Sequence, residues 1–351
     1  MNPKVSIILP VYNVEKYIDK CVGSLLNQSF DDFEVLIIND GSTDSSAEAC
    51  NRWAERDSKV KVFHQQNAGV AAARNQGLAN ARGEFVFFAD PDDWIESNLL
   101  EDCYSLATKY KTDIVLFGFF KEQLRNGNEI TTKIQPPELY MLSKTQIRQD
   151  LVQYLTVANG FSVWTKFIKK SLITEHNLSF PAMRRGQDMA FSLELYANAH
   201  SIVATPNCYY HYNAFSETNK YDPDIISNHI YLYDKMYRMF DNWLEEKKNS
   251  AYAVRLFILW FCYVIPANIV ANKKSTKTEK LRELRTLMSQ PSIRLYLNKF
   301  NKLPHLPFIS RTYLNLLRFN NAVLLLYITK LARFINSRSS LNLKKAIRSQ
   351  K

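Results

Sequence analysis

The sequence predicts an α/β fold with a mostly parallel central sheet, followed by a C-terminal helical region. Up to about residue 120, short apolar runs alternate with helical patterns, as is typical of parallel sheets. Polar and acidic residues follow several of these runs, where an open sheet binds ligands. Beyond Tyr221 only helical patterns remain. We therefore expect a catalytic, ligand-binding domain over residues 1–220 and a basic helical region over 221–351.

The predicted strands are short apolar runs, most of them flanked by polar residues: Val5–Leu9, Phe33–Asn39, Val60–His64, Glu84–Phe88 and Asp113–Phe120. The predicted helices between them are Ile18–Leu26, a helix capped by Ser42 or Thr43 that runs through Trp53, Gly69–Ala81, and Leu99–Ala107. Gly127 and Asn128 are suited to the turn of a hairpin.

Three segments organise the C-terminal region. The most apolar run, Leu256–Val270, contains Pro266 and Asn268, so a buried helix fits it better than a membrane span. The segment Asn272–Leu284 is charged and lacks a strong apolar face, which predicts a linker. From His305 onward, apolar and basic residues alternate in an amphipathic pattern.

Charge is distributed unevenly over the 351 residues, whose net charge is +11. Residues 271–351 contain 18 Lys and Arg and 2 Asp and Glu, a net charge of +16. The rest of the chain contains 27 basic and 32 acidic residues, a net charge of −5. Such a basic region suits an anionic membrane surface or a nucleic acid. The 5 cysteines form no CxxC pair and no cleavable leader is recognisable, which favours a reducing cytoplasm without a zinc site.

The strongest motif is the run Asp90-Pro91-Asp92-Asp93, directly after the apolar run Glu84–Phe88. Alternate carboxylates at the mouth of a sheet suit a hard divalent cation that also touches phosphate oxygens. A polar loop that only caps the next helix is the alternative. The GxGxxG and GxxxxGK[ST] phosphate loops are both absent from the sequence, which disfavours dehydrogenases and P-loop enzymes.

Two further motifs lie at neighbouring strand ends. Asp40 ends the second strand, where its carboxylate can accept a hydrogen bond from a nucleotide base, or serve only in a capping turn. Asn67 to Asn75 contains Gly69, which permits close backbone approach, and Arg74, which could reach a diphosphate or lie at the surface.

In this order and spacing, Val5–Asn13, Val35–Asp44, Asn67–Asn75 and Gly83–Trp94 resemble family 2 glycosyltransferases, which have the GT-A fold and use nucleotide-sugar donors. The resemblance is strong over residues 3–120 and weaker to about residue 220. It implies a uridine site at Pro10, Tyr12 and Asp40, nucleotide contacts at Asn67, Gly69 and Arg74, and a DxD motif at Asp90 and Asp92. Asp90 would face the ribose and the metal, and Asp92 would ligate Mg²⁺ or Mn²⁺.

The resemblance continues at Gly186-Gln187-Asp188, which is similar to the family's Gly-Glu-Asp motif before a helix. Asp188 then corresponds to the catalytic base, and Gln187 stands where the family usually has Glu. A helix-capping role for Asp188 is the alternative. Trp164 and Lys166 match a Trp-x-Lys segment, so with Gln187 they are tentative acceptor contacts, although Trp164 is equally suited to a core.

A late strand and loop, Tyr209 to Lys220, resembles the segment that closes over the diphosphate. The family usually has Arg there, and this sequence offers only Lys220 or His211.

The resemblance implies an inverting, metal-dependent transferase that moves a sugar from a UDP-sugar to a hydroxyl of a cell-surface glycan, such as capsule, O-antigen or exopolysaccharide. The expected location is the cytoplasmic face of the membrane, with peripheral membrane contact or oligomerisation through the basic region. The QxxRW motif of processive synthases is absent from the sequence. A donor-binding homologue with lost catalysis and a nucleic-acid-binding protein are the alternatives; a sugar-nucleotide pyrophosphorylase is disfavoured because Pro10–Tyr17 contains no glycine.

Overall fold

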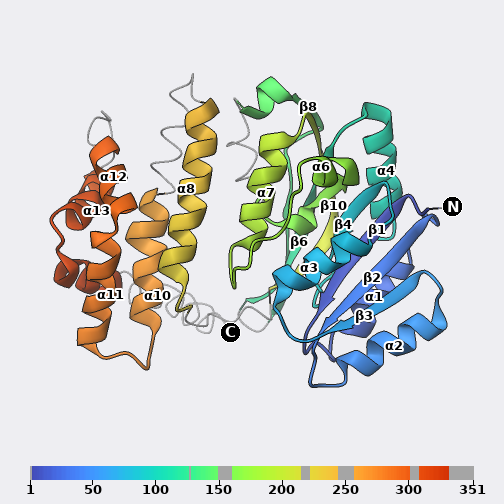
Figure 1. Ribbon diagram of the computed structural model, residues 1–351, viewed down its shortest axis with the longest axis horizontal. Helices are drawn as coiled ribbons and strands as arrows, with labels where there is room; N and C mark the ends of the chain where they lie inside the picture. The colour runs from blue at the N-terminus through green and yellow to red at the C-terminus, as the bar shows by residue number, and fades with distance from the viewer. Residues whose placement is uncertain are drawn as a thin grey trace, which may run out of the picture. The chain divides into compact units, whose positions relative to one another are not determined.

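The computed structural model describes residues 2–125, 128–148, 160–214, 222–243, 257–300 and 308–331. The chain divides into two compact units, Met1–Glu217 and Thr218–Lys351. The first unit contains a mixed sheet with helices on both faces, and the second is helical in its described segments (Figure 1). This architecture confirms the predicted α/β class with a C-terminal helical region.

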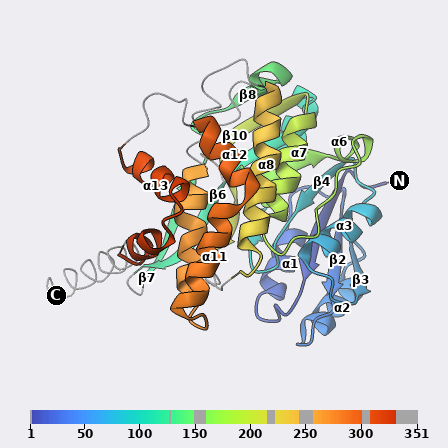
Figure 2. The same ribbon diagram turned by 60° about the vertical axis from the view of Figure 1, so that its left-hand side comes forward.

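The described helices of the second unit pack against one another (Figure 2). They are α8 (Ile225–Trp243), the π-helical segment η2 (Ile258–Val264), α10 (Ile265–Ala271), α11 (Lys277–Ser289), α12 (Pro291–Phe300), α13 (Phe308–Arg318) and a helix at 322–331. The predicted buried helix is confirmed in its described part, because Phe261, Cys262 and Ile265 are fully buried. No helix in the described segments is long and apolar enough to cross a membrane.

The predicted linker over 272–284 is wrong, because α11 begins within it. Thr276 and Glu279 form a reciprocal capping box at its start. The apolar stripe of this helix, Leu284, Leu287 and Met288, is buried, and it begins only where the predicted linker ends. The first half of the helix is therefore held by its cap and the second half by packing.

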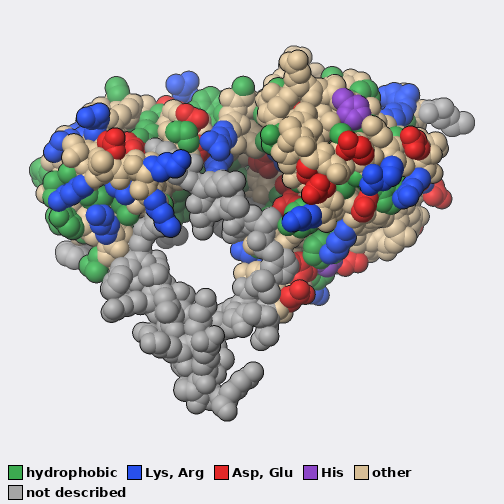
Figure 3. Space-filling view, turned by 90° about the horizontal axis from the view of Figure 1, so that it is seen from below, with side chains coloured by type: hydrophobic (Ala, Val, Ile, Leu, Met, Phe, Trp, Pro, Cys, Tyr) green, Lys and Arg blue, Asp and Glu red, His purple; other side chains and the backbone are tan. Residues whose placement is uncertain are grey.

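Basic side chains are prominent on the second unit. In the space-filling view, Lys and Arg side chains lie beside hydrophobic ones over this unit, and Asp or Glu side chains are sparse there (Figure 3). This matches the strong excess of basic residues after residue 271.

The sheet of the first unit has the strand order β3-β2-β1-β4-β9-β6-β10-β5 in the described residues, with β7 paired to β6 and β8 to β10. The strands are β1 (Val5–Val11), β2 (Phe33–Asp40), β3 (Val60–Gln65), β4 (Phe85–Phe88), β5 (Trp94–Ile95), β6 (Ile114–Arg125), β7 (Asn128–Ile134), β8 (Tyr140–Ser143), β9 (Lys166–Lys169) and β10 (Ser201–Asn213). Strands β3, β2, β1 and β4 pair in parallel, as predicted.

Strand β9 is the main departure from a parallel sheet. It lies antiparallel between β4 and β6, so a strand from late in the chain separates two strands that are consecutive in the predicted pattern. Strands β6 and β7 pair as a hairpin, with Arg125 opposite Asn128. Asn128, predicted in the turn, is the first residue of β7, and Gly127 lies outside the described residues.

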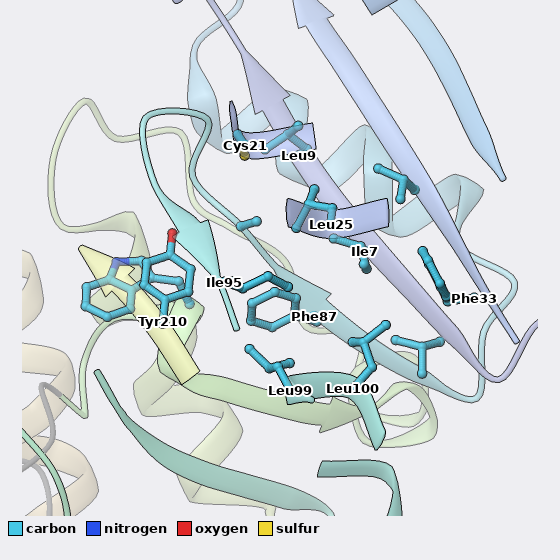
Figure 4. Packing of buried hydrophobic residues seen from close by; sticks show 14 of the residues in the cluster. Ile7, Leu9, Cys21, Leu25, Phe33, Phe87, Ile95, Leu99, Leu100 and Tyr210 are labelled. Carbon is cyan, nitrogen blue, oxygen red and sulfur yellow. The ribbon is translucent and has the colours of Figure 1, made fainter. Parts of the chain in front are cut away.

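Alternate residues of the central strands serve the two faces of the sheet. Ile7, Leu9 and Phe87 pack in a cluster with Leu25 of α1 (Ile18–Leu26) and Leu99 of α4 (Leu99–Tyr110) (Figure 4). On the opposite face, Phe88 packs edge-on against Phe180 and Phe191. Burial on both faces explains why these strands read as continuous apolar runs.

The remaining described helices of this unit are α2 (Ser46–Arg56), α3 (Val70–Asn80), η1 (Val163–Thr165), α6 (Lys170–Glu175) and α7 (Gln187–Asn198). The predicted cap of α2 is wrong, because the helix starts after Ser45. Thr43 N donates to Asn13 Oδ1 and Asn13 N donates to Ser42 Oγ, so these polar residues join two strand-end loops instead of capping.

Helix α3 lies close to the sheet through Gly77. A Cβ at Gly77 would overlap the side chain of Ile8, whereas a Cβ at Gly23 of α1 would meet nothing within 4 Å. We therefore expect Gly77→Ala to lower the free energy of unfolding by about 1–3 kcal/mol through overpacking. Gly23→Ala, the matched control, should be neutral or stabilising by up to about 1 kcal/mol. Urea denaturation of the two variants measures both; equal effects would contradict the close approach.

Candidate active site

The acidic loop between β4 and β5 holds three carboxylates in different environments. Asp93 is 2% exposed, and its oxygens accept hydrogen bonds from Tyr210 Oη (2.6 Å) and from the backbone N of Asn213 (2.7 Å). Burial, reinforced by the neighbouring carboxylates of Asp90 and Asp92, raises the pKa of Asp93 to about 8. Asp93 therefore anchors the loop, while Asp90 and Asp92 are partly exposed.

Arg74 of α3 connects this loop to the predicted base. Its Nη2 donates to Asp90 Oδ1 at 2.7 Å, and its Nη1 donates to Asp188 Oδ1. The Arg74 side chain is 3% exposed, so the surface alternative for this residue is wrong. Three motifs that are far apart in the sequence thus meet at one buried guanidinium.

Asp188 lies in the first turn of α7, whose N-cap residue is Gly186 with a φ of 88°. The Asp188 side chain pairs with Arg74, and α7 has no side-chain cap hydrogen bond. Burial is the largest influence on the pKa of Asp188 and raises it, while the Arg74 guanidinium opposes this rise. Within the described segments Asp188 Oδ2 accepts no hydrogen bond, so this oxygen is available to a ligand.

Two buried polar atoms near this pair have no hydrogen-bond partner in the described part of the chain, Arg74 Nε and Gln187 Oε1. One is a donor and the other an acceptor, and an unsatisfied buried polar atom costs about 1–3 kcal/mol. A bound ligand or water that satisfies them would recover this cost.

Asp40 organises the loop that precedes α3. Its Oδ1 accepts from Gln65 Nε2 (2.6 Å) and the backbone N of Ala68 (2.8 Å), and its Oδ2 accepts from the backbone N of Gly69 (2.8 Å). Asn67 Nδ2 donates to the carbonyl of Asp40 (3.0 Å). Gly69 has a φ of 90°, which favours glycine. Asp40, whose carboxylate is predicted to bind uridine, thus also holds this loop in place.

The other two predicted uridine residues lie at the end of β1. Pro10 is buried within the strand, and Tyr12, which follows it, leaves 48% of its surface exposed. A Tyr ring exposed beside a sheet mouth is available for stacking on a base. These two residues and Asp40 lie at the ends of adjacent, paired strands.

Trp164 and Lys166 are deeply buried. Trp164 is 4% exposed and stacks between Tyr210 and Tyr212, with ring centroids 4.6 and 5.4 Å away, which agrees with the core alternative. Lys166 Nζ donates to the carbonyl of Ser162. Burial lowers the pKa of Lys166 to about 7, although the charge of Asp188 opposes this. Neither side chain presents a surface to an acceptor.

Strand β10 supports the acidic loop, a role that no local sequence pattern indicated. Besides binding Asp93, Tyr210 Oη accepts from the backbone N of Asp90 (3.0 Å), and Asn213 Nδ2 donates to the carbonyl of Asp92 (3.1 Å). His211 is bound through both ring nitrogens, to Glu122 (2.9 Å) and Glu96 (2.8 Å). Lys220 lies outside the described residues.

A cavity of about 380 Å³ adjoins the loop on the side of α1. Charged and polar residue types predominate among those that line it: Lys16, Tyr17, Lys20, Asp92, Asp93, Trp94, Glu122, Glu129, His211 and Asn213. Asp92 is therefore one of the residues that line this cavity.

The oxygen atoms that this loop offers as ligands suit a hard divalent cation. Asp90 and Asp92 offer carboxylate oxygens, whereas both oxygens of Asp93 are already hydrogen-bonded. In the described segments no cluster of three or more His, Cys, Asp or Glu residues could hold a metal. Two protein carboxylates suit a Mg²⁺-type ion that takes its other ligands from phosphates and water.

Comparison with known proteins identifies the enzyme class. The family model for glycosyl transferase family 2 matches residues 6–171. The putative glycosyltransferase EpsH of Bacillus subtilis (strain 168) is 32% identical over 318 residues, covering 86% of this chain and 88% of EpsH.

Solved structures share the fold. S. aureus TarS in complex with UDP matches 94% of this chain and 91% of its own, with a TM-score of 0.67 and 21% identity. A mannosyltransferase from Pyrobaculum calidifontis, in complex with GDP-Man and Mn²⁺, covers 92% and 86%, with a TM-score of 0.50 and 18% identity.

The protein is an enzyme of the glycosyltransferase class, built on the GT-A fold with a C-terminal helical region. Its similarity to EpsH extends over most of both chains. The chain belongs to glycosyltransferase family 2.

Proposed function

We propose that the protein is an inverting glycosyltransferase that uses a UDP-sugar and a divalent cation, with Asp188 as its catalytic base. The observation that carries this proposal is the Arg74 guanidinium, which binds both Asp90 of the DxD motif and Asp188. It brings the donor motif and the candidate base to one place. An inverting reaction needs one general base and forms no covalent intermediate. Asp188 would be that base, and Asp90 would belong to the donor site.

In the proposed reaction the acceptor hydroxyl gives its proton to Asp188 Oδ2. The acceptor oxygen forms a bond to C1 of the donor sugar while the bond from C1 to the diphosphate oxygen breaks. The sugar is transferred with inversion and the nucleoside diphosphate departs. Arg74 binds Oδ1 of Asp188, which would leave the second oxygen for the acceptor hydroxyl.

The nucleotide is proposed to lie at the ends of β1 and β2. Tyr12 would stack on the base, and Asp40 and the loop at Asn67 and Gly69 would line its edge. The matching TarS structure was solved in complex with UDP, which supports uridine as the base in this proposal.

Asp92 and Asp90 would hold the divalent cation. When bound, such an ion neutralises the negative charge that develops on the departing diphosphate. The mannosyltransferase of the same fold was solved with Mn²⁺, which supports Mn²⁺ or Mg²⁺ as the candidate.

The acceptor is proposed to be a hydroxyl of a growing cell-surface glycan, carried on a lipid and reached from the cytoplasmic face of the membrane. The strongly basic C-terminal region is the feature that supports this location. Gln187 Oε1, buried and unpartnered in the described segments, is available to a sugar hydroxyl.

The first test is calorimetric titration of UDP into the protein with Mn²⁺ and again with EDTA. Metal-dependent UDP binding is expected, followed by turnover of a UDP-sugar. Binding without turnover of any UDP-sugar would favour the non-catalytic homologue. Absence of UDP binding in both conditions would overturn the uridine assignment.

Asp92→Asn should abolish metal-dependent turnover and leave the fold intact, because Asp92 faces the cavity and its substitution is isosteric. We expect loss of at least about 100-fold in kcat, measured as UDP release over a Mn²⁺ titration. The matched control is Asp102→Asn, a carboxylate of α4 outside the loop, whose metal dependence should equal that of wild type. Normal metal-dependent activity in Asp92→Asn would remove Asp92 as the ligand.

A further inference from the structure

The helix at 322–331 has two opposite apolar faces. Ala322, Leu325 and Leu326 are at most 3% exposed and pack within the second unit. Val323, Leu324, Tyr327 and Leu331 are 44–58% exposed, and at 100° per residue they fall on one side of the helix. Phe319, just before the helix, is 75% exposed. We call the four exposed side chains of the helix, Val323, Leu324, Tyr327 and Leu331, the exposed apolar face.

An exposed face of this kind is unusual on a helix that already buries its other side. A surface helix normally places polar residues opposite its buried stripe. Contiguous exposed apolar side chains mark a surface that binds another apolar surface.

Cationic groups border this face. Lys330 is exposed on the same helix, and Lys277 of α11 donates from Nζ to Tyr327 Oη at 3.1 Å. The 20 residues after Leu331 contain 6 Lys and Arg and no Asp or Glu. The surface that this face binds is therefore expected to be apolar and negatively charged.

We propose that the exposed apolar face binds the surface of a lipid bilayer that contains anionic lipids, with Leu324 and Leu331 inserted among the acyl chains. A short amphipathic helix in this position gives weak, reversible attachment, and neighbouring Lys and Arg side chains strengthen that attachment at an anionic surface.

A second copy of the chain is the main competing occupant, and charge disfavours it. Residues 271–351 carry +16, so two copies joined through this face would bring like charges together. An anionic bilayer complements the same charges. The proposal deepens the cytoplasmic-face location given above and does not depend on the donor or on Asp188.

The test is co-sedimentation of the full-length protein with vesicles of phosphatidylcholine alone and of phosphatidylcholine with phosphatidylglycerol. We expect binding to the anionic vesicles, weakened by salt, and little binding to the neutral ones. The variant Leu324→Ser/Leu331→Ser should reduce the partition coefficient at least about tenfold, because each exposed Leu loses part of its apolar transfer energy.

The matched control is Leu259→Ser/Leu295→Ser, which alters two Leu residues of the same unit that are 47% and 53% exposed but lie outside the face. Its vesicle binding should equal that of wild type. UDP binding, measured in parallel on all variants, keeps this test separate from the proposed function.

Three results would overturn the proposal. Wild type could fail to bind the anionic vesicles. The Leu324→Ser/Leu331→Ser variant could bind as well as wild type, which would leave the basic residues alone responsible. A dimer in solution that only this variant loses would assign the face to a second copy.

Discussion

Asp188→Asn is expected to lower kcat by about 10²–10⁴-fold while UDP affinity stays within about twofold of wild type. The amide has the size of the carboxylate but cannot accept the acceptor proton. Because burial raises the pKa of Asp188, wild-type kcat should fall with decreasing pH at a point above the ordinary Asp value of about 3.9. Steady-state kinetics and UDP calorimetry on the same preparations measure both effects.

The control for this change is Glu194→Gln, the same type of substitution further along α7. It should leave kcat within about twofold of wild type. A kcat in Asp188→Asn equal to that of Glu194→Gln would place the base elsewhere.

Arg74→Met should be the most destabilising single change at the site. It removes the guanidinium but leaves the Asp90 and Asp188 carboxylates, whose side chains are only 25% and 24% exposed. Breaking a buried pair on one side typically costs about 3–5 kcal/mol. We expect the free energy of unfolding, measured by urea denaturation at pH 7, to fall by an amount near the lower end of this range. The fall should be smaller at lower pH, where Asp188, whose pKa burial raises, becomes protonated.

Arg82→Met provides the matched control. Arg82 pairs with Glu34 at 3.3 Å, but its own side chain is 56% exposed, so its loss should cost less than about 1 kcal/mol. Adding Asp188→Asn to Arg74→Met should restore part of the stability, because it removes one unpaired charge. Equal losses for the two Arg variants, or no recovery in the double variant, would contradict a charge-based role for Arg74.

UDP calorimetry on Arg74→Met also separates the two roles considered for this residue. The family resemblance predicts that Arg74 lies beside the nucleotide, whereas in the structure its guanidinium binds two carboxylates. A strong loss of UDP affinity in a folded variant would support the nucleotide contact, and unchanged affinity would limit Arg74 to positioning.

Local sequence patterns predicted most elements of the first unit to within a few residues. Strands such as Val5–Val11 and helices such as Ile18–Leu26 follow from apolar runs and 3.6-residue periodicity, which depend on neighbours along the chain. The start of α2 and the helix α11 were missed, since polar side chains there find partners in loops and caps that periodicity does not detect.

Contacts between residues that are far apart in the chain could not be predicted from local sequence patterns. Strand β9 inserts antiparallel between β4 and β6, and its short run Lys166–Lys169 does not indicate a partner 80 residues earlier. Trp164 is likewise a core residue because of the rings that surround it, which no local pattern reveals.

By itself the sequence determined the α/β class, the approximate positions of the central strands and the acidic run Asp90–Asp93, because these depend on residue type and short-range spacing. Only the tertiary structure decided how the carboxylates differ: Asp93 is buried by Tyr210 and Asn213, whereas Asp90 shares Arg74 with Asp188. These contacts join residues up to 120 positions apart. Desolvation and charge pairing depend on distance in space, so the chain had to fold before the roles of its carboxylates were set.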